Sequence, residues 1–356
     1  MIVTGGGTGG HLFPGIAVAE EMLRRFPQDR ILFVSTGRAI DNQTLAARSF
    51  EKKAIDCLPL KGKSAWGTLK GLAQLPISLW QALRIVRAFK PRLVLGVGGY
   101  VTGPVVLAAR LMGVKTCIHE QNSVPGMANR MLGKIVDQIY ISIPGSEAFF
   151  PGGKVTLTGN PVRAELLQEA GRQKNQTAVK TVLVLGGSQG AHRVNGLMVD
   201  ACSVNLSANQ IQIRHQTGSS DEAWVRKAYA AAGITAQVSP FINDMAEAYR
   251  AADLVVSRAG ATTLAELAVL GKPAILIPYP YAADDHQTTN AAFLASGGAA
   301  LMFQERDLDG AKLRGEIMGL LSDATRLQSM ATKMKEYGRP KATAAIVEKS
   351  IQLLAA

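Results

Sequence analysis

Short runs of leucine and β-branched residues alternate along this chain with longer segments in which apolar residues recur every three or four positions. The short runs are typical of strands buried on both faces, and the longer segments have the period of amphipathic helices. Helices are predicted within residues 15–25, 68–89 and 262–270. Strands are predicted at residues 31–35, 93–96, 115–119, 138–142, 181–185, 211–216, 236–239, 254–257 and 274–278.

This alternation indicates an α/β protein with parallel sheets. The strands are too many for one ordinary sheet, and 356 residues suit two domains. An (α/β)₈ barrel would also fit the count, but a strand that runs into a glycine loop and a helix occurs twice, at residues 1–11 and 181–191. We therefore expect two Rossmann-like, doubly wound domains, residues 1–159 and 160–340, that face each other across a cleft where ligands bind.

The N-terminus and the most apolar segment bear on membrane insertion and targeting. Residues 1–4 run straight into glycines, which predicts no signal peptide, and so short a first strand leaves an upstream start codon open. The longest charge-free apolar run, residues 93–109, holds four glycines and a proline. It is too short and too broken for a spanning helix.

The composition limits the partners. Hydrophobic residues make up 47% and charged residues 19%, which argues for a folded chain, and the net charge is +12. Such a charge suits nucleic acid, an anionic membrane or anionic small molecules. Aromatic residues are only 6% and no nucleic-acid-binding module is recognisable, so nucleic acid is disfavoured. Three cysteines without a CxxC pair argue against a disulfide framework or structural zinc and fit a reducing cytoplasm.

The positive charge is concentrated in the first half of the chain. Residues 1–160 hold 19 bases and 9 acids, and no acid lies between Cys57 and His119. The basic and apolar region 61–92 suits an anionic bilayer surface, with Pro76 bending or starting its helix. The alternative is an ordinary helix that buries the same apolar side chains. That stripe consists of Leu72, Leu75, Leu79, Trp80, Leu83 and Val86.

The first glycine loop has anion-binding chemistry. Residues 5–10 match a dinucleotide fingerprint, in which backbone amides and the helix dipole attract phosphate. NAD also needs an acid at the end of the second strand, where Thr36, Gly37 and Arg38 stand instead; Arg38 leaves an NADP site open. His11 directly follows the loop, where it is placed for acid–base work or merely caps or packs the helix.

A similar strand, turn and helix in residues 257–266 predicts a nucleotide site in the second half. A diphosphate could lie on the amides of Ala261 to Thr263. Glu266 could accept both hydroxyls of a ribose, although an acid in the first turn also complements the helix dipole.

Taken together, these residues resemble the MurG family of peptidoglycan glycosyltransferases over essentially the whole chain. The motifs that carry the resemblance are Gly6-Gly7-Thr8-Gly9-Gly10-His11, Phe13-Pro14-Gly15, Gly98-Gly99-Tyr100, His119-Glu120-Gln121-Asn122, Gly159-Asn160-Pro161-Val162-Arg163, Gly186-Gly187-Ser188-Gln189-Gly190-Ala191, Arg258 to Glu266, and Asp285-His286-Gln287. The resemblance implies a GT-B fold with the donor nucleotide in the C-terminal domain. It also implies that a last helix, residues 341–354, returns to the N-terminal, acceptor-binding domain.

The implied reaction moves N-acetylglucosamine from its UDP carrier to the 4-hydroxyl of N-acetylmuramic acid in lipid I, forming lipid II. Acceptors such as a diacylglycerol or a polyketide stay open as alternatives. By the resemblance, the first domain would contact the donor across the cleft through Thr8, Gly9 and Gly10, with Asn122 on the sugar. The other implied donor contacts are Arg163 and Ser188 at the phosphates, Ile242 at uracil, Ala261, Thr262, Thr263, Leu264, Ala265 and Glu266 along the diphosphate and ribose, and Gln287 at the sugar. His286 and Thr288 flank Gln287 where some relatives have a second glutamine.

Since the donor is α-linked and the family's product is β-linked, the resemblance implies inversion with a general base. His11 is the predicted base and Glu120 its rival. We expect no cofactor and no metal: Asp307-Leu308-Asp309 has the form of a DxD site but lies past every donor motif, in the context of a helix start. The expected location is the cytoplasmic face of the bacterial plasma membrane, bound peripherally through region 61–92.

Overall fold

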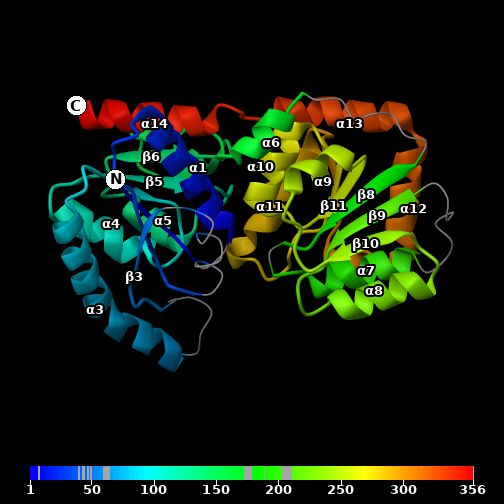
Figure 1. The fold of residues 1–356 in the computed structure, drawn as a ribbon, viewed down its shortest axis with the longest axis horizontal. Coiled ribbons are helices and arrows are strands. Elements are labelled where there is room, and N and C mark those ends of the chain that lie inside the picture. Colours follow the sequence, from blue (N-terminus) through cyan, green and yellow to red (C-terminus); the bar gives the residue numbers. More distant parts are fainter. Residues whose placement is uncertain are drawn as a thin grey trace. The chain divides into compact units, whose positions relative to one another are not determined.

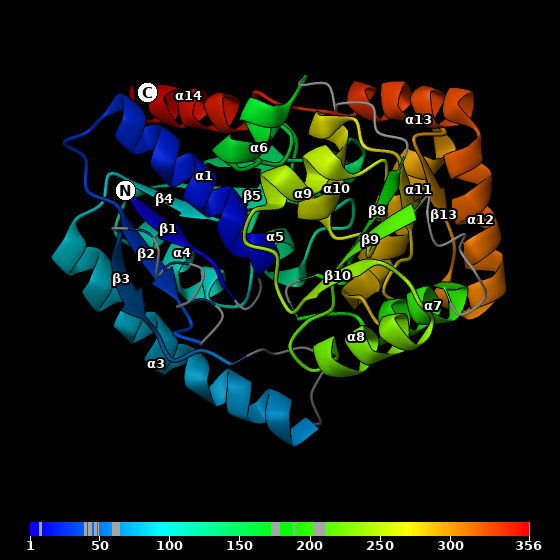
Figure 2. The same cartoon turned by 45° about the vertical axis from the view of Figure 1, so that its right-hand side comes forward.

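The structure is a computed structural model that describes residues 1–6, 9–38, 41, 45, 48, 50–58, 65–171, 179–187, 189–202 and 211–355; side chains at 9 and 65–72 are outside this description. The chain divides into two compact units. Unit 1 consists of Met1–Arg163 with Pro340–Ala356, and unit 2 is Ala164–Arg339. Each unit contains one parallel sheet with helices on its faces (Figures 1 and 2).

Unit 1 contains a seven-stranded parallel sheet in the order β3-β2-β1-β4-β5-β6-β7. Its strands are β1 (Ile2–Thr4), β2 (Leu32–Ser35), β3 (Glu51–Ala54), β4 (Leu93–Gly96), β5 (Lys115–Glu120), β6 (Gln138–Ile141) and β7 (Val155–Leu157). Its helices are α1 (Gly9–Arg25), α3 (Ala65–Phe89), α4 (Thr102–Leu111), α5 (Met127–Leu132), the 3₁₀ helix η1 (Ser146–Phe149) and α14 (Ala342–Ala355).

Two apolar layers hold unit 1 together, one on each face of its sheet. Successive residues of β1 point to opposite faces, as the pleat requires: Ile2 packs with α3, α4 and α5, and Val3 packs with α1 and α14. The last helix belongs to this core, since Ile346 and Val347 are fully buried in it. The chain therefore returns to its first sheet after completing unit 2.

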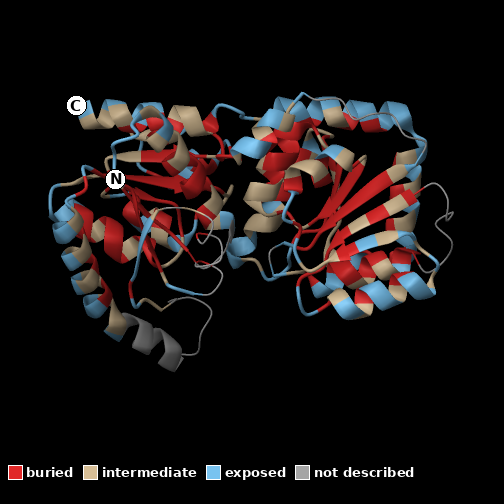
Figure 3. Ribbon diagram, viewed as in Figure 1, coloured by how far each residue is buried: buried red, intermediate tan, exposed pale blue. Residues whose placement is uncertain are grey.

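Unit 2 contains a six-stranded parallel sheet in the order β10-β9-β8-β11-β12-β13. Its strands are β8 (Lys180–Leu185), β9 (Ile211–Gln216), β10 (Ala236–Ser239), β11 (Leu254–Ser257), β12 (Ala274–Leu276) and β13 (Ala300–Met302). Its helices are α6 (Ala164–Glu169), α7 (His192–Cys202), α8 (Glu222–Ala231), α9 (Met245–Ala251), α10 (Ala261–Leu270), α11 (His286–Ser296), α12 (Gly310–Ser322) and α13 (Ala324–Glu336), with 3₁₀ turns η2 (Ala283–Asp285) and η3 (Glu305–Asp307). Buried residues are concentrated on the central strands of each sheet (Figure 3).

The strands predicted from apolar runs are confirmed, with ends that shift by up to two residues. Three further strands, β3, β7 and β13, went unpredicted. The first of these, Glu51–Ala54, is charged and fully exposed, so it has no apolar pattern. Helix α3 runs unbroken across Pro76, so the suggestion that this proline starts the helix was wrong.

The strand order of each sheet reverses direction at one point. In unit 1 this switch lies between β1 and β4, and in unit 2 it lies between β8 and β11. Loops on either side of such a switch leave the sheet in opposite directions, which opens a crevice at the carboxyl edge of the strands. The residues after β1, β4, β8 and β11 are therefore the ones that the fold makes available to a ligand.

Candidate functional site

The first glycine loop leads into α1 at the switch point of unit 1. Thr8 lies outside the described residues, whereas Gly9 and Gly10 are the first two residues of α1. Their amides belong to the helix N-terminus, where the peptide dipoles favour an anion. His11 is the next residue, so the imidazole stands at the start of the same helix.

His11 is held against two other loops. Its Nδ1 lies 3.3 Å from Oε1 of Gln121, which follows β5. On another side lies Gly98, after β4, with a positive φ of 101°; a Cβ atom there would be 2.8 Å from the His11 Nδ1. Glycine is required at this position both for its backbone conformation and for room beside the imidazole.

Glu120, the rival candidate for the base, is hydrogen-bonded to the loop that follows β5. Its buried carboxylate accepts hydrogen bonds from the backbone N–H of Asn122 (2.9 Å), from the Asn122 side chain (3.2 Å), from the Gly126 N–H (3.2 Å) and from Asn129 Nδ2 (2.8 Å). Both oxygens are thus engaged with the loop that follows β5. These four hydrogen bonds make Glu120 a residue that shapes this loop and orients Asn122.

Arg163, which the resemblance assigns to the donor phosphates, is the last residue of the first segment of unit 1. Its guanidinium carbon lies 5.0 Å from the centre of the Phe13 ring, a cation–π contact that places the cation beside α1. Arg163 and His11 therefore both lie next to the first turns of this helix. Gly159, which opens the motif containing Arg163, accepts a hydrogen bond from the buried His119 ring at 3.1 Å.

Sequence reasoning missed one acid near the first glycine loop. Asp41 is fully buried, accepts a hydrogen bond from Thr36 Oγ1 at 2.6 Å, and stands where a Cβ on Gly6 would lie 2.8 Å from its carboxylate. The expectation that no acid stands near the end of the second strand was wrong in space, because the Asp41 carboxylate lies within hydrogen-bond distance of Thr36. Arg38 is the residue that left an NADP site possible. Its guanidinium carbon lies 5.5 Å from the centre of the Tyr100 ring, a cation–π contact.

In unit 2 the second glycine loop follows β8. Ser188 lies outside the described residues, but the neighbouring Gly187 accepts a 2.9 Å hydrogen bond from Gln216 Nε2. The Oε1 atom of the same glutamine accepts from the Ile242 backbone N–H at 3.0 Å. The N–H of Ile242 is therefore engaged within the protein, and its carbonyl is the group that could meet a uracil. Through these two hydrogen bonds Gln216 joins the loop after β8 to the loop after β10, and the sequence did not predict this role.

Helix α10 begins at Ala261 and presents the second candidate phosphate cradle. Gly260 is its N-cap, and Ala261, Thr262 and Thr263 are partly exposed at its N-terminus. Further along, Leu264 and Ala265 lead to Glu266, whose buried carboxylate accepts a 2.9 Å hydrogen bond from the Tyr249 hydroxyl. Tyr249 fixes the orientation of this carboxylate and was missed because it lies on α9, remote in sequence.

Gln287 stands in the first turn of α11. Its Oε1 atom accepts the backbone N–H of Ala259 (3.2 Å) and that of Tyr279 (3.0 Å). The glutamine thus joins the loop after β11 to the loop after β12, and its NH₂ group is the donor it can offer to a sugar hydroxyl. The described residues contain no cluster of three or more His, Cys, Asp or Glu side chains able to hold a metal. Asp309 caps α12 by accepting the Lys312 N–H at 2.7 Å, as its context predicts.

Two Rossmann-like parallel-sheet domains, with glycine loops and helix N-termini at both switch points, are the arrangement of the GT-B fold, which many glycosyltransferases share. Residues 1–141 match the glycosyltransferase family 28 N-terminal domain, and residues 181–346 match the C-terminal domain of the same family. The chain belongs to glycosyltransferase family 28.

Relatives of full length support this assignment. A protein of Desulfotalea psychrophila named UDP-N-acetylglucosamine–N-acetylmuramyl-(pentapeptide) pyrophosphoryl-undecaprenol N-acetylglucosamine transferase is 48% identical and covers 99% of this chain and 96% of its own length. A Syntrophus aciditrophicus protein of the same name is 45% identical, covering 99% and 98%. The crystal structure of Acinetobacter baumannii MurG aligns with a TM-score of 0.78 at 32% identity over 99% of both chains. The resemblance drawn from the motifs is confirmed.

Proposed function

We propose that this enzyme transfers N-acetylglucosamine from UDP-N-acetylglucosamine to the 4-hydroxyl of N-acetylmuramic acid in lipid I, which yields lipid II for the cell wall. The full-length identity to transferases named for this reaction carries the proposal. The residues of unit 2 support a nucleotide donor, because α10 offers amides at its N-terminus and Glu266 offers an oriented carboxylate.

The chemical step is a single in-line displacement with inversion. The acceptor 4-hydroxyl oxygen attacks the anomeric carbon as its proton passes to His11, and the bond from that carbon to the diphosphate breaks with the electron pair leaving on UDP. Backbone amides at helix N-termini and the Arg163 cation stabilise the charge that develops on the diphosphate. The residues described here supply the base and the charge stabilisation from the protein itself.

Replacement of His11 tests the base. A general base contributes about 10²–10⁴-fold, so His11→Ala should lower kcat by that order and spare UDP binding. A turnover near that of the parent enzyme would sink the assignment.

The donor site is tested by calorimetry with UDP, UDP-N-acetylglucosamine, UDP-glucose and NADPH. UDP-N-acetylglucosamine should bind and NADPH should not. Tyr249→Phe removes the hydroxyl that orients Glu266, and loss of one such hydrogen bond should weaken UDP binding by about five- to tenfold. Tyr140→Phe is the matched control, since it loses a hydroxyl bonded to Ser350 in unit 1. Equal affinities in both variants would contradict a ribose role for Glu266.

We further propose that unit 1 binds an anionic membrane surface, on the cytoplasmic side, through α3 and α4. Ile77 and Trp80 are 53% and 56% exposed on α3, and Leu111, at the end of the neighbouring α4, is 65% exposed. The Arg84 guanidinium lies 4.7 Å from the Trp80 ring, so apolar and cationic groups share this face. No helix among the described residues is long and apolar enough to cross a bilayer.

The structure divides the apolar stripe predicted in region 61–92. Val86 is buried, and Leu79 and Leu83 pack against the same core, so the ordinary amphipathic interpretation is right for them. Trp80 and Ile77 face outward. The side chains of Leu72 and Lys70 and all of Lys61 and Lys63 lie outside the described residues.

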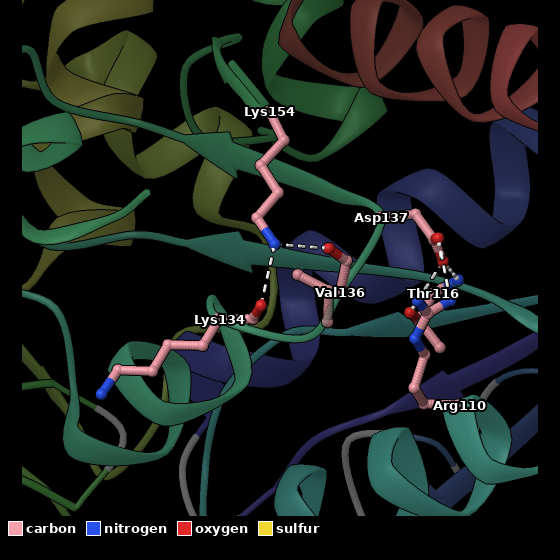
Figure 4. A network of polar contacts seen from close by, with 6 residues as sticks. All are labelled: Arg110, Thr116, Lys134, Val136, Asp137 and Lys154. Carbon is pink, nitrogen blue, oxygen red and sulfur yellow. Dashed lines mark hydrogen bonds and ion pairs between the residues drawn. The ribbon is translucent and has the colours of Figure 1, made fainter. Parts of the chain in front are cut away.

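The charge available to a membrane is smaller than the sequence suggested. Arg110 lies in the acid-free stretch between Cys57 and His119, but its guanidinium is 3.1 Å from the Asp137 carboxylate, which also accepts from Thr116 (Figure 4). Lys154 donates to the carbonyls of Lys134 and Val136 in the same network. Arg84 and Arg87, on the exposed face of α3, are therefore better candidates for lipid headgroups.

Vesicle binding tests the membrane proposal. The double variant Ile77→Ser/Trp80→Ser should lose binding to phosphatidylglycerol vesicles in a flotation assay. The single variant Arg84→Glu keeps the apolar side chains but not the cation, so its vesicle binding should depend less on salt concentration than that of the parent protein. Tyr281→Ser is the control, because Tyr281 is 81% exposed in unit 2. Vesicle binding that is unchanged in the double variant would rule the surface out.

A further inference from the structure

We infer that Gln121 is a positioning residue that holds His11 as the Nδ1–H tautomer. His119 in turn orients the Gln121 amide through a hydrogen bond to its Nε2 atom. The inference rests on the proposed function, in which His11 accepts the proton of the acceptor hydroxyl. Hydrogen bonds join His119 to Gln121 and Gln121 to His11, and all three side chains are buried or half-buried. The protonation of His119 therefore determines which nitrogen of His11 carries its proton.

The orientation of the Gln121 amide is fixed by main-chain carbonyls. Its Nε2 atom lies 2.8 Å from the Val97 oxygen and 3.3 Å from the His119 oxygen. Carbonyl oxygens only accept, so a flipped amide would set its own oxygen against two acceptors. Gln121 is 2% exposed, and no water can make up for such a loss cheaply.

His119 supports the same orientation. Its Nε2 atom lies 3.1 Å from the Gly159 carbonyl, which can only accept, and 3.1 Å from the Ser142 hydroxyl, which can accept as well as donate. A proton on Nε2 is the arrangement that satisfies both. Burial lowers the pKa of the His119 imidazole to about 4, which keeps the ring neutral in neutral solution. Its Nδ1 therefore holds a lone pair. One N–H of Gln121 goes to the Val97 oxygen, and the second is shared between His119 Nδ1 at 3.1 Å and the His119 carbonyl at 3.3 Å.

The Gln121 oxygen then faces Nδ1 of His11 at 3.3 Å. Because that oxygen can only accept, the proton of the neutral His11 ring is on Nδ1 and the basic lone pair is on Nε2. A histidine without such a partner exchanges between both tautomers. Gln121 therefore selects the form in which Nε2, the nitrogen that does not face Gln121, is the base.

Histidine ¹⁵N spectra of the full chain test this directly, with the His11 signals identified by their loss in His11→Ala. In the parent protein His11 should be the Nδ1–H tautomer. In Gln121→Met it should lose this preference, and kcat should fall by about 10- to 100-fold while the KM for UDP-N-acetylglucosamine stays the same. Gln138→Met is the matched control, because Gln138 donates to the Lys154 carbonyl and to Thr156 in the same unit.

A second variant guards against a folding defect. In its protonated form the Gln121→Glu side chain keeps an acceptor oxygen toward His11 and donates its O–H to the Val97 carbonyl, so on the acid side of this carboxyl's titration the Nδ1–H signature should persist and kcat should exceed that of Gln121→Met. The inference is overturned if His11 remains Nδ1–H in Gln121→Met, or if Gln121→Met turns over like the parent while His11→Ala does not. Full turnover of His11→Ala would overturn the base assignment itself, whatever the tautomer of His11.

Discussion

The hydroxyl of Tyr140 on β6 lies 3.0 Å from the Ser350 hydroxyl on the last helix, although 210 positions separate the two residues along the chain. Both groups are buried in unit 1. The hydrogen bond marks the place where the end of the chain completes the core of the first sheet. Stability of unit 1 therefore depends on residues that follow the whole of unit 2.

Truncation of a buried side chain in α14 tests this dependence. Ile346 is fully buried between α1 and the sheet, so Ile346→Ala should lower the free energy of unfolding of unit 1 by about 2–5 kcal/mol. Urea denaturation provides the measurement. Gln352→Ala changes an exposed residue of the same helix and should have almost no effect. Equal stabilities of the two variants would refute a core role for α14.

Glu120→Gln separates a loop-shaping role from a base role. A glutamine presents an NH₂ group to N–H donors of Asn122, Gly126 or Asn129, so the loop should shift and kcat/KM should fall by about 10- to 100-fold. The acidic limb of the pH–rate profile should remain, since His11 is still present. Disappearance of that limb would mean that Glu120, not His11, takes the proton.

Gly98→Ala should damage catalysis more than folding. Its backbone has a φ of 101° and its new Cβ would lie 2.8 Å from the His11 ring, so the imidazole must move. We expect kcat to fall by about tenfold or more. Gly103→Ala is the control, because a Cβ at that position on α4 meets nothing within 4 Å. A parent-like kcat in Gly98→Ala would show that the position of His11 is not tightly constrained.

Acid should destabilise unit 2 through a buried histidine. Burial lowers the pKa of His215 to about 3, well below the ordinary value of 6.5. As the pH falls below 6.5 the unfolded chain takes up a proton and the folded chain does not, so stability is lost progressively down to about pH 3. By pH 5 this one group should cost about 2 kcal/mol. Chemical denaturation between pH 7 and pH 5 should show this slope, and His215→Gln should reduce it; an identical slope would contradict the assignment.

The fold class could be predicted from the sequence because buried parallel strands leave uninterrupted apolar runs. Val182 to Leu185 is such a run, and the structure confirms it as part of β8. The charged strand β3 could not be found this way, because its side chains are exposed. The period of α3 likewise could not say which of its apolar residues face outward, since Trp80 and Leu79 are neighbours in the same stripe.

The site was only partly predictable for a related reason. His11, Glu120 and Glu266 stand in short motifs, so their chemistry is visible in the sequence. Their partners come from remote segments: Tyr249 orients Glu266 from another helix. Asp41 lies beside Gly6 of the first glycine loop, although 35 positions separate them along the chain. Sequence reasoning therefore named candidate groups, but it could not name the hydrogen-bond partners that packing brings to them.

The most direct test of the central claim is the identity of the product. The purified chain is incubated with UDP-N-acetylglucosamine and either lipid I or a diacylglycerol, and the product is analysed by mass spectrometry and by NMR of the new linkage. We predict transfer to lipid I alone, with a β-linkage to the 4-hydroxyl of N-acetylmuramic acid. Transfer to the diacylglycerol instead, or an α-linked product, would contradict the account.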